Sequence, residues 1–137
     1  MMSHKLNCIM LIDDDEDDNF FHEKAIVDNH LAETVIVKNS ARKALEYIKA
    51  KTEPLSDLIL LDINMPVMTG WEFLDEYNQL EKELEHKAII IMLSTSINNI
   101  DVEKSKTWNF VSDYITKPLT KEKMEIIIDK YFKNFLV

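Results

Sequence analysis

The 137-residue chain carries 25 acidic and 16 basic residues, for a formal net charge of −9, and 46% of its residues are hydrophobic. This length predicts one domain, residues 1–137, with a buried core. The acidic balance argues against a nucleic-acid-binding protein, because such domains are usually basic. The chain has one cysteine, no apolar stretch long enough to span a bilayer and no recognisable signal peptide, so we expect a cytoplasmic protein without membrane attachment.

Unbroken apolar runs mark three of the expected strands. They cover residues 8–12, 58–61 and 88–93, and they lack the apolar–polar alternation of a half-exposed strand. Strands that are covered on both faces, as in a parallel sheet, have this pattern. Two shorter segments complete the expected set of five strands, residues 34–37 and 113–116.

Apolar residues at helical spacing occupy the segments between these strands. Acids after the first run suit the first turn of a helix, which we expect to end near His30. Ser40 is a candidate N-cap for the second helix, and Thr120 opens the fifth. Thr69 and Glu72 have the spacing of a capping box for the third helix. The apolar residues of the expected first helix are Phe20, Phe21, Ala25, Val27 and Leu31.

Five strands that alternate with five helices through short loops predict a single doubly wound parallel sheet of the α/β class. The fourth helix is the least regular, because its apolar stripe in residues 97–108 is only partial. The flavodoxin-like strand order 2-1-3-4-5 is one of two common choices, and it is the one that we expect. It places the first and third strands side by side.

The segment from Asp57 to Gly70 joins the third strand to the third helix. Its apolar run stops on Asp62, and Pro66 and Gly70 mark a loop. Gly70 is the only glycine of the chain, which predicts that the backbone needs conformational freedom close to Asp62. Asp62 is therefore expected at the carboxyl end of a strand, where open α/β sheets place their functional groups.

The residues that follow the strands of such a sheet share one edge. They are Asp13 and Asp14 after the first strand, Asp62 after the third, Ser94 after the fourth and Lys117 after the fifth. Clustered carboxylates repel one another and favour a hard divalent cation such as Mg²⁺. The lysine supplies a positive charge for an anion such as a phosphoryl group, and the hydroxyl can donate a hydrogen bond to it. An aspartate in these surroundings can act as a nucleophile and carry a phosphoryl group.

With these residues in this order, the chain resembles the receiver domain of two-component response regulators. The resemblance extends from about Asn7 to Tyr131, within an expected core of residues 7–133. The motifs that carry it are Asp13-Asp14, Asp62 in Leu-Asp-Ile-Asn-Met-Pro, Gly70, Ser94, Tyr114 and Lys117-Pro118. No single motif is diagnostic, but together, in the family's order and spacing, they are specific.

The resemblance implies a phospho-acceptor and a metal site. Asp62 is then the acceptor, and Asp13 and Asp14 bind Mg²⁺. The backbone carbonyl of Asn64 completes the protein's share of the metal ligands. Because three consecutive acids follow the first strand, the sequence leaves open whether Asp13 and Asp14 or Asp14 and Asp15 hold the metal.

The resemblance also implies the groups that contact the phosphoryl group and respond to it. Ser94 and Lys117 contact the phosphoryl group, although residues 95–96 offer neighbouring hydroxyls. Ser94 and Tyr114 form the switch. The Lys117–Pro118 peptide bond is expected to be cis.

The function implied is that of a stand-alone receiver without an output domain. It accepts a phosphoryl group from the phosphohistidine of a sensor histidine kinase or a histidine phosphotransfer protein, and it catalyses only its own phosphotransfer and dephosphorylation. Phosphorylation then alters the binding of a downstream protein at the face of the fourth helix, fifth strand and fifth helix, or the domain relays the phosphate. The sequence names neither the kinase nor the downstream protein.

Two other functions fit parts of the pattern. A phosphatase of the haloacid-dehalogenase type also uses a strand-end aspartate, but it requires a second one two residues later, where this chain has Asn64. A receiver-like interaction module that binds partners without phosphorylation usually lacks an acid or the lysine, and this chain keeps them all.

Trp71 is interpreted as a packing residue. The histidines lack metal-ligand spacing and are interpreted as surface residues: His4, His22, His30 and His86.

Overall fold

The computed structural model describes residues 5–65, 67–95 and 98–132. Its strands are β1 (Leu6–Ile12), β2 (Ala32–Lys38), β3 (Leu58–Asp62), β4 (Ile89–Ser94) and β5 (Val111–Thr116). Its helices are α1 (Glu16–Asp28), α2 (Ala41–Lys49), α3 (Gly70–Glu81), α4 (Asn99–Ser105) and α5 (Lys121–Phe132). Within these ranges, no helix is both long and apolar enough to cross a membrane.

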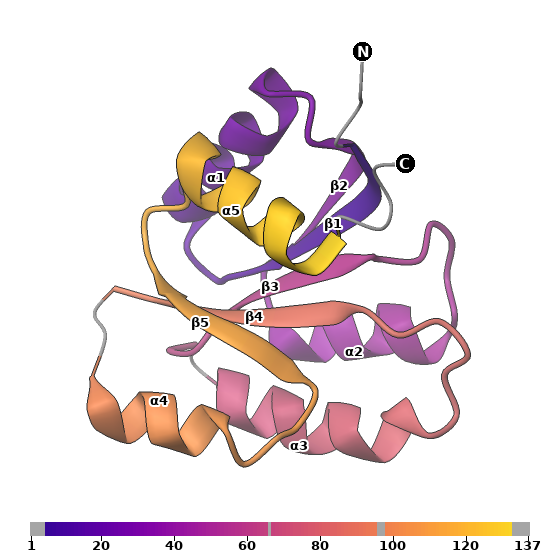
Figure 1. The fold of residues 1–137 in the computed structure, drawn as a ribbon. Helices are drawn as coiled ribbons and strands as arrows, with labels where there is room; N and C mark the ends of the chain where they lie inside the picture. Colours follow the sequence, from indigo (N-terminus) through magenta and orange to yellow (C-terminus); the bar gives the residue numbers. More distant parts are fainter. Residues whose placement is uncertain (1–4, 66, 96–97, 133–137) are drawn as a thin grey trace.

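The strands form one parallel sheet in the order β2-β1-β3-β4-β5. Helices α1 and α5 cover one face of the sheet, and α2, α3 and α4 cover the other (Figure 1). The flavodoxin-like fold and the strand order expected from the sequence are therefore confirmed. Because β1 and β3 are neighbours, the residues that follow them meet at the carboxyl edge of the sheet.

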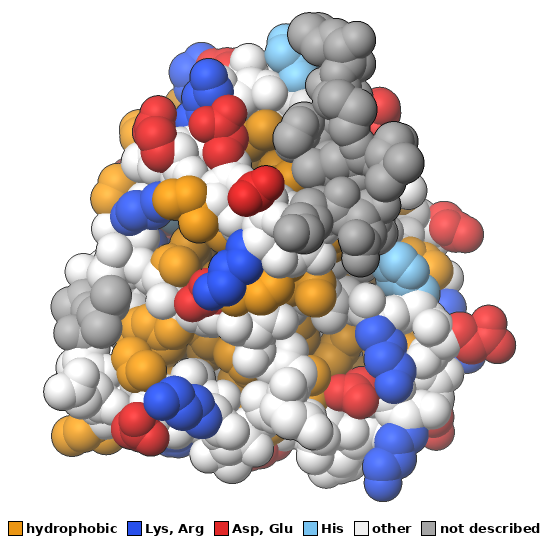
Figure 2. Space-filling view, in the orientation of Figure 1, with side chains coloured by type: hydrophobic (Ala, Val, Ile, Leu, Met, Phe, Trp, Pro, Cys, Tyr) orange, Lys and Arg blue, Asp and Glu red, His pale blue; other side chains and the backbone are white. Residues whose placement is uncertain are grey.

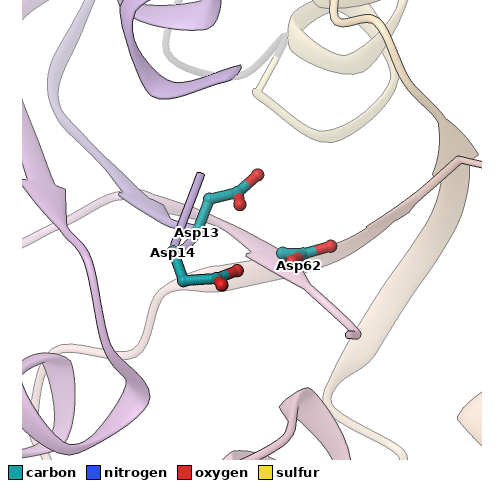
Figure 3. Close-up of side chains that lie close together, drawn as sticks. All are labelled: Asp13, Asp14 and Asp62. Atoms are coloured by element: carbon teal, nitrogen blue, oxygen red, sulfur yellow. The ribbon is translucent and has the colours of Figure 1, made fainter. Parts of the chain in front are cut away.

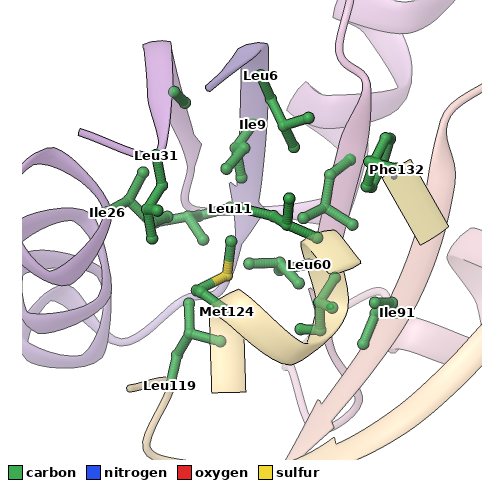
Figure 4. Packing of buried hydrophobic residues seen from close by; sticks show 14 of the residues in the cluster. Leu6, Ile9, Leu11, Ile26, Leu31, Leu60, Ile91, Leu119, Met124 and Phe132 are labelled. Carbon is green, nitrogen blue, oxygen red and sulfur yellow. The ribbon is translucent and has the colours of Figure 1, made fainter. Parts of the chain in front are cut away.

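The apolar runs are unbroken because both faces of the central strands are covered. All five residues of β3 are buried. Leu58 and Leu60 pack on the side of α1 and α5, whereas Ile59 and Leu61 pack on the opposite side. Figure 4 shows the first layer, in which Met124 of α5 lies among side chains of the strands. Each fully buried aliphatic side chain contributes about 1.5–3 kcal/mol, so β3 is a firmly held support for its last residue.

Helix α1 does not turn its largest apolar side chains to the sheet. Phe20 and Phe21 are 70% and 55% exposed, whereas Asn19, His22 and Ile26 are buried. The N-cap fixes where the helix begins, and spacings of three and four residues then direct these three side chains inward. The interpretation of His22 as a surface residue is therefore wrong. Its burial lowers the pKa of the imidazole.

Strands β2 and β5 are longer than the sequence pattern predicts. Strand β2 begins at Ala32 instead of residue 34 and ends at Lys38, and β5 begins at Val111 instead of residue 113. Strand pairing is made by backbone groups, so the ladder of β1 and β2 continues from Ala32 to Lys38 through positions with polar side chains. The side-chain pattern alone therefore does not predict where these strands begin and end.

Candidate functional site

Three carboxylates meet at the carboxyl edge of the sheet. Asp13 and Asp14 follow β1, and Asp62 is the last residue of β3. Each contributes one oxygen to a group in which these atoms all lie within 4.8 Å of one another (Figure 3). Asp13 and Asp62 are buried, and Asp14 is exposed. The structure thus brings together the three acids that the sequence assigns to this edge.

Asp15 is the N-cap residue of helix α1. Its Oδ1 atom accepts hydrogen bonds from the backbone N–H groups of Asp17, at 2.9 Å, and Asp18, at 3.1 Å, and it thereby caps the helix. Its own N–H donates to Oδ1 of Asp13 at 3.0 Å. Of the two metal pairs that the sequence leaves open, the pair at 13–14 is the one that lies beside the end of β3.

Lys117 lies among carboxylates. Its Nζ atom is 2.8 Å from Oδ2 of Asp13, 2.8 Å from Oδ2 of Asp18 and 3.3 Å from Oδ1 of Asp62. The backbone N–H of Lys117 donates to the carbonyl of Ser94 at 2.7 Å, which ties the end of β5 to the end of β4. The peptide bond between Lys117 and the following proline is cis. The lysine therefore stands inside the acidic cluster, with only 10% of its side chain exposed.

Two side chains of α1 contact the site although the sequence pattern does not assign them to it. Asp18 pairs with Lys117, and Nδ2 of Asn19 donates to the backbone carbonyl of Asp13 at 2.7 Å. Side chains in a helix point back toward its N-terminus, and the N-terminus of α1 lies at this edge of the sheet. In the sequence the acidic run reads equally well as a favourable first helical turn, so its members are not distinguished.

The acids and the lysine line a hollow of about 650 Å³ at this edge. Asn64 and Thr95 also line it. Ser94, the last residue of β4, is buried and does not face the hollow, whereas Thr95 is exposed. Ser96, the other neighbouring hydroxyl, lies outside the described residues.

Burial and neighbouring charges shift the pKa values of both central groups. Burial, reinforced by the charge of Asp13, raises the pKa of Asp62 from 3.8 to about 6, and Lys117 opposes this shift. Burial by itself lowers the pKa of Lys117. Hydrogen bonds to Asp13 and Asp18 outweigh burial, so the pKa of the ammonium lies above its ordinary value. Lys117 is therefore charged at neutral pH, and Asp62 loses its proton less readily than an exposed aspartate does.

Gly70 is required by close packing. A Cβ atom at this position would lie 2.7 Å from the carbonyl oxygen of Asp62 and 2.9 Å from Cα of Ile63. Gly70 does not have a positive φ, so the prediction that it supplies conformational freedom is wrong. The left-handed residue of this loop is Val67, with φ of 67°.

The expected capping box is present, because Thr69 and Glu72 hydrogen-bond reciprocally at 2.9 and 3.2 Å.

Tyr114 lies on β5, and its side chain is close to that of Ser94. Burial raises the pKa of its phenol, contact with the Ser94 side chain lowers it, and Asp101 raises it. Its hydroxyl oxygen is buried and has no well-aligned hydrogen-bond partner among the described residues. The tyrosine thus lies next to the serine with which the sequence pairs it.

Comparison with protein families gives a match over residues 9–129 to the response regulator receiver domain. The matched segment contains the whole sheet edge described above. The chain belongs to this family.

Solved structures of receiver domains share the architecture. A two-component response regulator from Cytophaga hutchinsonii is 30% identical, with a TM-score of 0.83 over 92% of this chain and 96% of that chain. A response regulator receiver protein from Dyadobacter fermentans is 25% identical, with a TM-score of 0.81 over 91% of this chain and 97% of that one.

Curated relatives differ in how much of their length this chain spans. The transcriptional regulatory protein CitT of Halalkalibacterium halodurans is 27% identical over 95% of this chain but only 54% of its own length. Protein PilH of Pseudomonas aeruginosa is 27% identical over 82% of this chain and 88% of its own length. The chain therefore spans about half of CitT and most of PilH.

Receiver domains bind Mg²⁺ at an acidic pocket, and the donor set of this receiver fits that ion. Three carboxylates offer hard oxygen ligands within 4.8 Å of one another. With Asp18 there are four carboxylates against the single ammonium of Lys117 in the cluster, so a cation relieves their repulsion. An open hollow on the solvent side leaves room for the water ligands that Mg²⁺ usually keeps.

A pair of stacked tryptophans joins α3 of the receiver to the segment after α4. The rings of Trp71 and Trp108 lie 5.6 Å apart at an interplanar angle of 17°. Lys104 places its ammonium 4.8 Å from the centre of the Trp71 ring, and Trp108 donates to Asp75 at 3.2 Å. Trp71 follows Gly70 directly, so the stack lies one residue from the close packing of Gly70 against the backbone of Asp62.

Proposed function

We propose that this receiver accepts a phosphoryl group on Asp62 from the phosphohistidine of a sensor histidine kinase or a histidine phosphotransfer protein, in a reaction that requires Mg²⁺. The observation that carries this proposal is the position of Asp62. Its buried carboxylate lies within 4.8 Å of Asp13 and Asp14 and 3.3 Å from the ammonium of Lys117. A nucleophile, a cation site and a fixed positive charge are the groups that phosphoryl transfer needs.

The proposed transfer is an in-line displacement at phosphorus. An oxygen of the ionised Asp62 forms the new P–O bond while the P–N bond to the donor imidazole breaks. The electron pair of that bond stays on the imidazole nitrogen, which takes up a proton. Bound Mg²⁺ would be held by Asp13, Asp14, Asp62 and the carbonyl of Asn64, and it would neutralise charge on the phosphoryl oxygens.

Lys117 and Ser94 are proposed to contact the phosphoryl group after its transfer to Asp62. The ammonium of Lys117 already lies beside Asp62, where it can pair with a phosphoryl oxygen. Ser94 is buried next to Tyr114, so its hydroxyl must turn toward the phosphoryl group and leave space that the tyrosine can enter. Thr95 is the alternative donor, because its side chain is exposed at the hollow.

The signal is proposed to leave through the face formed by α4, β5 and α5. All six residues of β5 are partly exposed. Figure 2 shows apolar side chains over the region where β5 runs, with charged side chains above and below them. A downstream protein that prefers one of two conformations of this face would read the phosphorylation. We propose that the output of this receiver is this interaction or onward transfer of the phosphate.

Intact mass spectrometry after incubation with acetyl phosphate and Mg²⁺ tests the proposal. We expect one phosphoryl adduct on the wild type, none without Mg²⁺ and none on Asp62→Asn. Absence of an adduct, under conditions that label another receiver, would instead support a module that binds its partner without phosphorylation.

A further inference from the structure

Lys117 is shared by carboxylates from two different parts of the fold. Asp13 and Asp62 belong to the sheet edge, at 2.8 and 3.3 Å, whereas Asp18 belongs to helix α1, at 2.8 Å. The ammonium is thus closer to the helix carboxylate than to the proposed acceptor. Of these three partners of Lys117, Asp13 and Asp62 belong to the group of oxygens suited to a cation, together with Asp14, and Asp18 does not. When a cation is bound there, Asp13 and Asp62 also act as its ligands, whereas Asp18 pairs with Lys117 and not with the cation.

Asp18 is held in place by the start of α1. Its backbone N–H donates to the capping side chain of Asp15 at 3.1 Å. The next residue, Asn19, donates to the carbonyl of Asp13 at 2.7 Å and so fastens the same turn to the sheet edge. The side chain of Asp18 is 36% exposed, which places its ion pair at the rim of the site. Its carboxylate lines the same hollow as Asp62 and is therefore a negative charge close to the proposed acceptor.

We propose that Asp18 is a positioning residue that holds Lys117 toward α1 and thereby slows the phosphorylation of Asp62. This inference rests on the proposed function. A phosphoryl group on Asp62 must draw the ammonium from a carboxylate 2.8 Å away, and the incoming anion meets the extra negative charge of Asp18. Removal of that charge releases Lys117 from one of the two carboxylates that lie 2.8 Å away and lowers the repulsion of an anionic donor.

Asp17 provides the matched control. It lies beside Asp18 in the same acidic first turn, it is exposed, and it makes no contact with Lys117. Asp17→Asn and Asp18→Asn therefore change the net charge and the helix N-terminus equally. Only Asp18→Asn removes the ion pair with Lys117.

The test measures the rate at which acetyl phosphate labels Asp62, by intact mass, at saturating Mg²⁺. Acetate leaves with the electron pair of the broken P–O bond, so no proton donor is involved. We expect Asp18→Asn to be labelled about three to five times faster than Asp17→Asn, the factor that corresponds to an ion pair of ~0.6–1 kcal/mol. Asp18→Glu keeps the charge and should return the rate toward that of the wild type, which a purely structural role of Asp18 does not predict.

Equal or slower labelling of Asp18→Asn relative to Asp17→Asn overturns the inference, and so does equal acceleration by Asp18→Glu. Asp18→Ser also removes the charge and keeps a small polar residue at the helix start, so it must show the same acceleration. If Asp18→Asn does not fold, the labelling rate of Asp18→Ser tests the inference in its place. Labelling of the wild type is measured in parallel. Its absence means that the proposed function fails, whereas normal wild-type labelling with no effect at Asp18 means that only this inference fails.

Discussion

Replacement of Asp62 by asparagine is expected to stabilise the protein when divalent cations are absent. The folded protein holds this carboxyl at a pKa of about 6, against an ordinary value of 3.8. Because the folded state binds the proton more tightly than the unfolded state, the stability of the wild type falls as the pH rises through this interval. At ~1.36 kcal/mol per pH unit, the interval corresponds to about 3 kcal/mol, and the full penalty applies above pH 6. Asp62→Asn has the same shape and carries no such penalty.

Urea unfolding with a chelator present, at pH 5 and pH 8, measures this effect. We expect Asp62→Asn to exceed the wild type in free energy of unfolding by about 2–3 kcal/mol at pH 8, and by roughly 1.4 kcal/mol less at pH 5. Asp17→Asn removes one charge at the rim of the site and should show no comparable change between these pH values. A variant no more stable than the wild type at pH 8, or a difference that does not depend on pH, would refute the assignment of Asp62 as a buried, destabilising acid.

Three further outcomes follow from contacts at the site and beside it. Gly70→Ala must move backbone atoms that would lie 2.7 and 2.9 Å from the new Cβ, so urea unfolding should show a loss of about 1–3 kcal/mol; unchanged stability would contradict the close contact. Asp13→Asn removes a proposed Mg²⁺ ligand, and Mg²⁺ titration should show affinity at least about tenfold weaker, an effect that Asp17→Asn should lack. Trp108→Phe removes one ring of the protein's only two tryptophans, so the near-ultraviolet circular dichroism of the stacked pair should collapse while far-ultraviolet helicity stays; an unchanged spectrum would show that the rings do not stack in solution.

The sequence is most informative where burial decides the side chain at every position. The run at residues 58–61 predicts a strand covered on both faces, and β3 is buried at all of its positions. The order of polar residues after such runs predicts which side chains share the sheet edge, because parallel strands end together. Asp13, Asp14 and Asp62 accordingly lie within 4.8 Å of one another.

The sequence is least informative where a backbone contact or the rotational phase of a helix determines the role of a residue. The reason for Gly70 is the carbonyl of Asp62, which is close only in three dimensions, whereas composition suggests a flexible turn. The phase of α1 is set by its cap, so Phe20 points outward and His22 inward. Asp18 is one acid among several in the sequence, and only the fold distinguishes it by placing it 2.8 Å from Lys117.

Asp62 ends a strand that is covered on both faces, and this position determines which parts of the fold can change conformation when Asp62 is modified. Strand β3 pairs with β1 on one side and β4 on the other, and its side chains fill both apolar layers. A strand so placed exchanges its amide hydrogens only through large openings of the domain. In a hydrogen–deuterium exchange experiment, the amides of β3 should therefore have the same protection before and after modification of Asp62. Differences should be confined to the edge strand β5, to the loops at the ends of the strands and to the helices that these loops join, while β3 stays unchanged.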